Sequence, residues 1–466
     1  MRKKTGSVGL YARKIIYGAV LGLILIFTLE KLVMAQVCEE LKPVGASPDG
    51  RNGHVSVSSG GSEQFVFGGF NQNTDLWRLR EEGEGNWIWE NTGTREPNTP
   101  SERGGHSGIF ANGFDNSIIV FGGSASPLVA PSDIVPYKLA NPWDGSSKWE
   151  KLVPVGFFPP PMAEHTAVYD NNDNRMIVFG GYKAIDPVVA LNETYTLDFD
   201  LAFWPLVNPG DKPPARYGHS AVWTGGQMIV FGGKDNSQEF LDDCWQFDPV
   251  LNSWTPVPIT GDKPPARWQH TAVWKWEPME PGKMIIFGGE DKNGKPLDDF
   301  WVLYTPGPGE PNYRWKRIYP IGDLPSKRSG HAAGLFWGGD GEKVLIFGGF
   351  DGSNNLNDVY AFFKDEEVEQ ALEKKPFNAP NPFNPDTEDT KICYYLEEDD
   401  DDVKIKLFTL TGELVYSWEN ISGKAGLNQW PWNGKNEKGK IVENGGYICL
   451  IEAGGKKQKC KIAVLR

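Results

Sequence analysis

Short apolar runs recur through the middle of the chain, and each is followed by two glycines. The runs at 176–179 and 344–347 read Met-Ile-Val-Phe and Val-Leu-Ile-Phe, with no polar position. A run that is apolar throughout is typical of a strand that is covered on both faces. The glycines favour a tight turn or a close approach to another backbone. The pattern therefore predicts short buried strands with turns directly after them.

The glycine pairs belong to a longer unit that returns six times after residue 51. The unit has an apolar run after a histidine, then Phe-Gly-Gly, an acidic residue and an aromatic residue, and most units have a glycine before the histidine. The histidines lie 51 to 61 residues apart and include every histidine of the chain: His54, His106, His165, His219, His270 and His331. Five units also begin their last predicted strand with a tryptophan: Trp89, Trp149, Trp204, Trp254 and Trp315. The sixth unit has no such tryptophan.

A period near 50 residues with paired glycines and spaced aromatics resembles the kelch repeat, in which each unit builds one four-stranded propeller blade. The resemblance implies an all-β chain with a six-bladed kelch β-propeller over residues 36–363. A composition of 12% aromatic residues, with 55 Gly and 35 Pro, also suits short strands and turns better than long helices.

The beginning of this region resembles its middle. Residues 38–45 read CEELKPVG, and they align with WEKLVPVG at 149–156. We therefore expect the N-terminal segment to be the outer strand of the last blade, paired with residues 359–363, so that it closes the ring and removes an exposed strand edge. Cys38 takes the place of the missing tryptophan. Cys38→Trp is expected to stabilise the ring, provided that the last blade has not repacked around the smaller residue.

A second domain is predicted after a linker at 364–379. Residues 380–466 contain an Asn-Pro-Phe-Asn-Pro entry, then Trp-x-Gly, Gly-Tyr and a final strand. They resemble the immunoglobulin-like C-terminal modules of the flagellar hook-cap type and the sorting domains of type IX secretion cargo. The resemblance implies a small Ig-like β-sandwich and a surface or secreted location. A cleaved sorting signal and a passive domain both stay open.

The first 35 residues are typical of a secretory signal peptide. Basic residues up to Lys14 precede the apolar run 15–27, and small residues lie before a cleavage point after Ala35. We expect a secreted or cell-surface protein with no stable membrane span after signal cleavage. An uncleaved anchor is the alternative.

The net charge of −14 argues against nucleic acid as a partner, because no basic cluster follows the signal region. We expect a monomer without a cofactor. Each histidine belongs to a different unit, and no cysteine pair has the spacing of metal ligands, so no metal site is predicted. Arginines three residues before five of the histidines, with Met162 in the third unit, are interpreted as scaffold.

The predicted function is non-catalytic recognition of a protein or a glycan through propeller loops that break the repeat. One such loop, 182–192, begins at Tyr182. On the opposite face, Trp274 and Trp276 in the loop 274–283 are candidates for stacking on sugars, although Trp274 could instead pack inside its blade. The alternative is a carbohydrate-active enzyme, a sugar epimerase or oxidase. Polar side chains that differ between blades at the ring axis would favour the enzyme.

Five cysteines leave at least one unpaired in an exported chain. If Gly454 and Gly455 form a two-residue hairpin loop, Cys449 and Cys460 lie directly opposite each other. A disulfide between them is predicted. A pair of small buried hydrophobic residues is the alternative.

Overall fold

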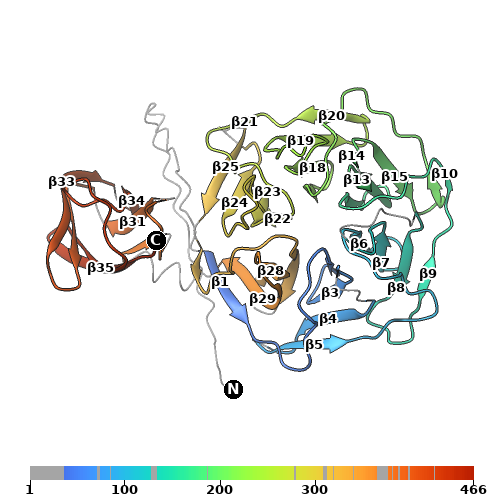
Figure 1. Ribbon diagram of the computed structural model, residues 1–466, viewed down its shortest axis with the longest axis horizontal. Helices are drawn as coiled ribbons and strands as arrows, with labels where there is room; N and C mark the ends of the chain where they lie inside the picture. Colours follow the sequence, from blue (N-terminus) through green and yellow to red (C-terminus); the bar gives the residue numbers. More distant parts are fainter. Residues whose placement is uncertain are drawn as a thin grey trace, which may run out of the picture. The chain divides into compact units, whose positions relative to one another are not determined.

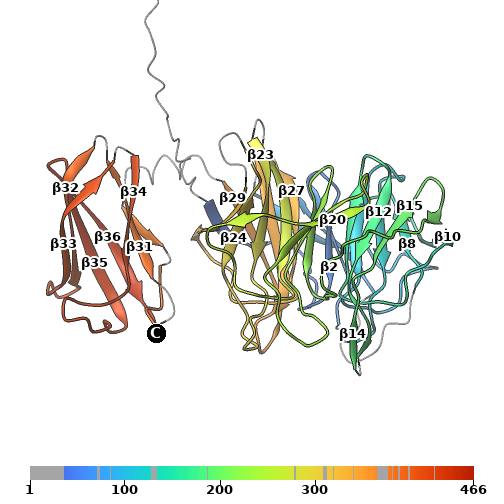
Figure 2. The same cartoon turned by 90° about the horizontal axis from the view of Figure 1, so that it is seen from above.

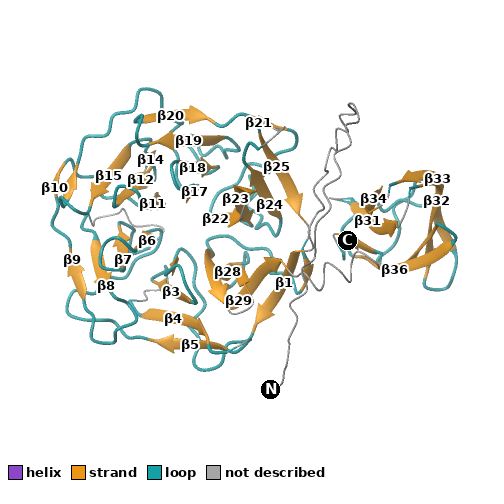
Figure 3. Ribbon diagram, turned by 180° about the vertical axis from the view of Figure 1, so that it is seen from behind, coloured by secondary structure: helices purple, strands orange, loops and turns teal. Residues whose placement is uncertain are grey.

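The computed structural model describes residues 36–466, except 71–73, 84, 127–133, 186, 278–279, 308–311, 319, 339–340, 365–375, 380, 387–388, 397–398 and 425. The predicted signal peptide lies outside the described residues. Within them, every regular element is a strand (Figure 3), and the fold is all-β. None of the described residues forms a helix that is long and apolar enough to cross a membrane.

Six sheets stand around a common axis in the described part of 36–364 (Figure 1). The first contains β2 (Val55–Ser58), β3 (Glu63–Phe67), β4 (Leu76–Glu81) and β5 (Trp87–Asn91). The second contains β6 (Ser107–Ala111), β7 (Ser117–Phe121), β8 (Tyr137–Ala140) and β9 (Trp149–Lys151). The third contains β11 (Thr166–Asp170), β12 (Arg175–Phe179), β15 (Thr194–Asp198), β16 (Phe203–Trp204) and the short β10 (Val155–Gly156).

The remaining three sheets follow the same order from the axis outward. The fourth contains β17 (Ser220–Trp223), β18 (Met228–Phe231), β19 (Cys244–Asp248) and β20 (Ser253–Pro256). The fifth contains β22 (Thr271–Glu277), β23 (Glu280–Phe287), β24 (Phe300–Tyr304), β25 (Tyr313–Ile318) and β21 (Ile259–Thr260). The sixth contains β27 (Ala332–Gly338), β28 (Gly341–Phe350), β29 (Asn355–Lys364), β1 (Gln36–Leu41) and β26 (Ile321–Gly322). The innermost strands contact one another in sequence, and β27 contacts β2.

The chain's first described strand lies in the sheet of its last repeat. β1 pairs antiparallel with β29 along its whole length, from Gln36 opposite Lys364 to Leu41 opposite Val359. The buried side chains of Cys38 and Leu41 point into the cores on either side of this sheet.

The segments that resemble one another in sequence make the same connection between sheets. After β1, Val44 forms a parallel bridge to Ile88 in the first sheet. After β9, β10 pairs in parallel with β16 of the third sheet. Gly156 is needed there because a Cβ atom would lie 2.3 Å from the carbonyl oxygen of Trp204. The Pro-Val-Gly sequence therefore pairs the segment after the outer strand of one blade with the outer strand of the next blade.

The tryptophans of the outer strands pack between blades. Each lies 4.5 to 5.7 Å, between ring centroids, from the phenylalanine before the glycine pair of the preceding sheet: Trp89 with Phe347, Trp149 with Phe67, Trp204 with Phe121, Trp254 with Phe179 and Trp315 with Phe231. Cys38 breaks this series. In its cluster Phe300 packs against Phe287 at 4.3 Å and against Phe362 at 5.0 Å. Phe300 of the fifth blade therefore fills the space beside Cys38, so we expect that the condition for a stabilising Cys38→Trp substitution is not met.

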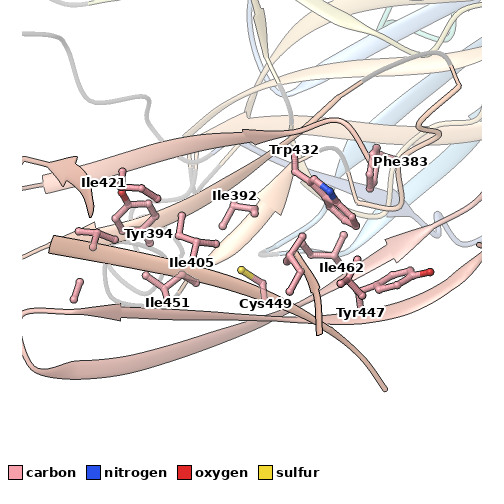
Figure 4. Close-up of a cluster of buried hydrophobic side chains, with 14 of the residues drawn as sticks. Phe383, Ile392, Tyr394, Ile405, Ile421, Trp432, Tyr447, Cys449, Ile451 and Ile462 are labelled. Carbon is pink, nitrogen blue, oxygen red and sulfur yellow. The ribbon is translucent and has the colours of Figure 1, made fainter. Parts of the chain in front are cut away.

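Residues 377–466 form two sheets that share one core. One contains β30 (Phe377–Ala379), β31 (Thr390–Leu396) and β34 (Gly426–Trp432), and β30 lies inside the range predicted as linker. The other contains β33 (Leu414–Gly423), β32 (Asp400–Thr409), β35 (Gly445–Ala453) and β36 (Lys456–Val464). Ile392, Ile405, Trp432 and Cys449 lie among the buried side chains between the sheets (Figure 4).

Candidate functional site

A ring of backbone hydrogen bonds surrounds the propeller axis. In each blade the residue before the histidine donates its N–H to the carbonyl of its counterpart in a neighbouring blade, over 2.6 to 2.9 Å, and the sixth bond closes the circle. The six residues are Gly53, Gly105, Glu164, Gly218, Gln269 and Gly330. All six have φ between 51° and 65°, in the left-handed region. This conformation favours glycine, and four blades have glycine there.

Glu164 and Gln269 are the two members of this ring that carry side chains. A non-glycine residue in this conformation costs about 1–2 kcal/mol, so the surrounding structure must hold both in place. Gln269 donates from Nε2 to Glu164 Oε1 over 2.9 Å. Glu164 Oε2 is buried and has no hydrogen-bond partner among the described residues. The axis thus holds an acidic group whose hydrogen bonding is incomplete.

A pocket of about 150 Å³ lies at this ring. Its lining includes Glu164, Gln269, the glycines of the ring, the six histidines and Phe70. The Phe70 ring lies so close to Gly53 that a Cβ atom there would approach it to 2.4 Å. The glycines of blades one and two therefore make room for an aromatic ring beside the pocket.

The pocket environment changes the acidity of Glu164. Burial raises the pKa of its carboxyl to about 7, although the Gln269 hydrogen bond and the charge of Lys234 act in the opposite direction. Glu290 adds to the upward shift of the pKa. Glu164 therefore changes its charge near neutral pH.

The histidines that line the pocket are part of the scaffold. Four of them use Nε2 to bond a hydroxyl of a neighbouring blade at 2.8 to 2.9 Å, such as His165 with Ser107 and His331 with Thr271. Burial lowers the pKa of His165 and of His331 to about 3 and that of the other four well below the ordinary value. They stay neutral at physiological pH and hold blades together, as the repeat pattern suggested.

Side chains that differ between blades surround the pocket on the face where the chain turns after each glycine pair. Lys234 Nζ lies 3.4 Å from the Trp268 ring centroid and 3.9 Å from Glu290 Oε1. Trp268 Nε1 donates to Glu290 Oε1 over 3.0 Å, and the Trp268 ring packs edge-on against Tyr217. We call these residues, with Phe70 and the hairpin at 182–190, the axial face.

Comparison with known proteins shows where this fold belongs. The model of the KLHDC2/KLHL20/DRC7 Kelch-repeats domain matches residues 133–277 and 241–382, which is more than half of the chain. The chain belongs to the kelch-repeat family. Human host cell factor 2 is 29% identical over 282 residues, covering 56% of this chain and 32% of that protein. Rat kelch domain-containing protein 3 is 26% identical over 263 residues, covering 54% of this chain and 62% of that protein.

The solved structures support the same architecture. The structure of YjhT aligns with a TM-score of 0.50 at 14% identity, covering 70% of this chain and 98% of that one. At this identity the likeness shows the fold alone. The kelch chain spans less than two thirds of the length of the curated relatives it matches.

Tyr182 lies on the axial face but is largely covered. It begins the hairpin of β13 (Tyr182–Ile185) and β14 (Val188–Ala190), which projects beyond the other kelch strands in Figure 2. The Tyr182 side chain is 5% exposed and packs edge-on against Tyr217. The exposed residues of the hairpin that can touch a ligand are Lys183 and Pro187.

The other two predicted ligand residues lie at the far end of β22 from the axial pocket. Trp274 is 8% exposed and belongs to the core between two blades, which is the alternative that the sequence left open. Trp276 is 54% exposed and packs edge-on against Trp274 at 5.8 Å. Trp276 alone of the two is exposed enough to stack on a ligand, and it lies on a different face from Tyr182.

Cys449 and Cys460 are directly opposite each other in the β35–β36 pair. Both are free cysteines in the structure, with Cys449 buried and Cys460 partly buried, and the disulfide stays a prediction. Among the residues that the structure describes, no group of three or more His, Cys, Asp or Glu side chains is placed to hold a metal ion.

The sequence interpretation missed Glu164 and Gln269. Their signal was present, because the residue directly before each repeat histidine is glycine in four units and is Glu164 or Gln269 in the others. The importance of that difference depends on the ring, which brings two residues 105 positions apart into hydrogen-bond contact.

Proposed function

We propose that this kelch protein is an exported, non-catalytic recognition protein that binds a protein or a glycan through its axial face. One observation carries the proposal. The repeated residues serve the scaffold, whereas Phe70, Lys234, Trp268 and Glu290 differ from blade to blade and gather beside one pocket. Aromatic and charged groups of this kind are typical of binding surfaces. Membership of the kelch-repeat family favours a protein partner.

The proposal is tested by screening residues 36–466 against protein and glycan arrays. The same screen is run with a variant in which a short glycine-containing turn replaces residues 183–189 at the tip of the hairpin. Recognition through the axial face requires that the hits of the natural chain weaken in this variant, while its melting temperature is kept. An unchanged set of hits would contradict it.

Export and surface attachment form the second part of the proposal. The N-terminal signal pattern and the resemblance of residues 380–466 to Ig-like sorting modules support an exported chain that is fixed or routed by its last domain. Two sheets with one shared core suit such a module. N-terminal sequencing and cell fractionation test this part, and an intact residue 1 in a cytoplasmic fraction would overturn it.

Ring closure by the first strand is the third part. The pairing of β1 with β29 supports it, as does the parallel bridge between Val44 and Ile88 of the first blade. Removal of β1 would leave β29 as an exposed edge, so a variant beginning at Ala46 should melt less cooperatively and aggregate. The same melting curve for both chains would contradict closure.

A carbohydrate-active enzyme, such as a sugar epimerase, is the second candidate. Two observations favour it. Glu164 and Gln269 are polar side chains at the ring axis where the other four blades have glycine. The Glu164 carboxyl also has a pKa of about 7, which suits proton transfer. The test follows reducing sugars by NMR for accelerated anomer or epimer exchange. Exchange that Glu164→Gln abolishes would replace non-catalytic recognition as the function.

A further inference from the structure

The axial pocket holds two oxygens that can accept hydrogen bonds from a ligand, and both lie on the Glu164–Gln269 pair. Gln269 uses its amide N–H group on Glu164 Oε1, which leaves the amide oxygen of Gln269 as an acceptor. Glu164 Oε2 has no partner in the described part of the chain. A buried carboxylate oxygen without a partner is unfavourable, so a ligand that donates hydrogen bonds gains from entering this pocket.

We propose that the axial pocket binds a lysine side chain of a protein partner, with its ammonium group at the Glu164 carboxylate and its stem beside Phe70. This rests on the proposed function, since it names the chemistry by which the axial face recognises a protein. An ammonium group has three donors and no acceptor, which complements the two acceptors at the axis. The aromatic ring of Phe70 favours a cation and an apolar stem.

The hydrogen bonding of the Glu164 carboxyl favours lysine over arginine. A guanidinium group binds carboxylates best through both oxygens at once. Glu164 Oε1 already accepts the Gln269 bond, so only Oε2 remains. A point-like ammonium group fits this single oxygen better.

The neighbouring blade shows the same chemistry within the chain. Lys234 lies over the Trp268 ring and beside Glu290, so that one ammonium group meets an aromatic face and a carboxylate. Glu164 and Phe70 offer the corresponding pair at the axis. A lysine from another protein would complete the second arrangement.

The proposal predicts that binding depends on pH. Glu164 is ionised above its pKa of about 7, and only the ionised form attracts the ammonium group strongly. The affinity should therefore fall about thirtyfold between about pH 8 and about pH 5.5. The histidines of the pocket stay neutral in this range, and the pKa values of Tyr182 and of Tyr217, which also face Glu164, are raised to about 12. Lys234 and Glu290 also face Glu164, and both remain in the Glu164→Gln variant, which isolates the effect of Glu164.

The probe is the peptide acetyl-Gly-Lys-Gly-amide, titrated into residues 36–466 and followed by NMR up to about 10 mM. The matched peptide carries Nε-acetyl-lysine, which keeps the stem and removes the charge. Glu164→Gln is compared with Glu150→Gln, a control on the exposed surface of β9. We expect acetylation and Glu164→Gln each to weaken binding by roughly tenfold or more, and Glu150→Gln to have no effect.

Three results would overturn the proposal: no binding of the lysine peptide, equal binding of the acetylated peptide, or equal binding by Glu164→Gln. The comparison of peptides uses the natural chain, so it does not depend on the folding of a variant. If array hits still depend on the hairpin while the lysine peptide fails, recognition through the axial face stands and lysine is the wrong ligand.

Discussion

Replacement of Cys38 by tryptophan should destabilise the propeller, although tryptophan occupies this position in the other five blades. Cys38 is fully buried in one cluster with Phe300 and Phe362. Phe300 directly follows the acidic residue of its repeat, where blades one, three, four and six have Leu76, Thr194, Cys244 and Val359. The large phenylalanine and the small cysteine therefore compensate for each other across the interface between blades five and six.

The expected changes in unfolding free energy follow from the sizes of the side chains at positions 38 and 300. Overpacking by Cys38→Trp should cost about 1–3 kcal/mol of unfolding free energy. Phe300→Cys removes most of a buried aromatic side chain and should cost about 3 kcal/mol. The double variant recreates the pair of Cys244 and Trp315 that blades four and five use. It should lie within about 1 kcal/mol of the natural chain, with a favourable coupling of roughly 3 kcal/mol or more.

The assay is equilibrium denaturation of residues 36–466 for the natural chain, both single variants and the double variant. Unfolding is followed by tryptophan fluorescence and by circular dichroism, because agreement of the two probes tests whether one transition is measured. Two results would show that the side chains at positions 38 and 300 do not compensate for each other. One is a Cys38→Trp variant that is more stable than the natural chain, and the other is a double variant whose loss of unfolding free energy equals the sum of the two single losses.

Three further predictions concern buried groups and surfaces. Burial lowers the pKa of His165 and of His331 to about 3, so their contribution to stability is complete above about pH 6.5 and is lost as the pH falls toward 3, at about 2 kcal/mol for each of the two by pH 5. Thermal melts at pH 7.5 and 5 should differ strongly, and equal melts would contradict the neutrality of these histidines. Trp274→Ala should cost about 3–5 kcal/mol of unfolding free energy, which denaturation measures. Trp276→Ala should leave the unfolding free energy unchanged and weaken only the binding of ligands at its own face, which array binding measures. A disulfide between Cys449 and Cys460 should add roughly 3 kcal/mol; mass mapping with and without reductant tests it, and two free thiols in the exported protein would remove it.

Much of the scaffold could be predicted from local pattern. The apolar runs before the glycine pairs are strands, and the outer tryptophans are buried, because each repeat must fill the same space between blades. The different exposure of Trp274 and Trp276 could not be predicted from the sequence. It depends on where β22 extends beyond the neighbouring blade that covers it, near the register shift between Lys275 and Glu277. The burial of Tyr182 could not be predicted for a similar reason, because it depends on packing against Tyr217, which lies 35 positions further along the chain.

The axial site was harder to predict for a different reason. Glu164 and Gln269 lie far apart in the chain, and each alone is a polar residue before a histidine. They form a site only because six repeats close into a ring and place both at its centre. A pattern that is read along the chain reports what the repeats share, whereas this site consists of what two repeats do not share.

Hydrogen–deuterium exchange of residues 36–466 with and without a partner from the arrays tests the central claim most directly. The account predicts that a bound partner protects the backbone around Phe70, Glu164, the hairpin at 182–190 and Gln269. The outer strands, such as β9 and β20, should exchange as in the free chain. Protection confined to the outer strands, to the end of β22 at Trp276 or to residues 377–466 would contradict recognition through the axial face.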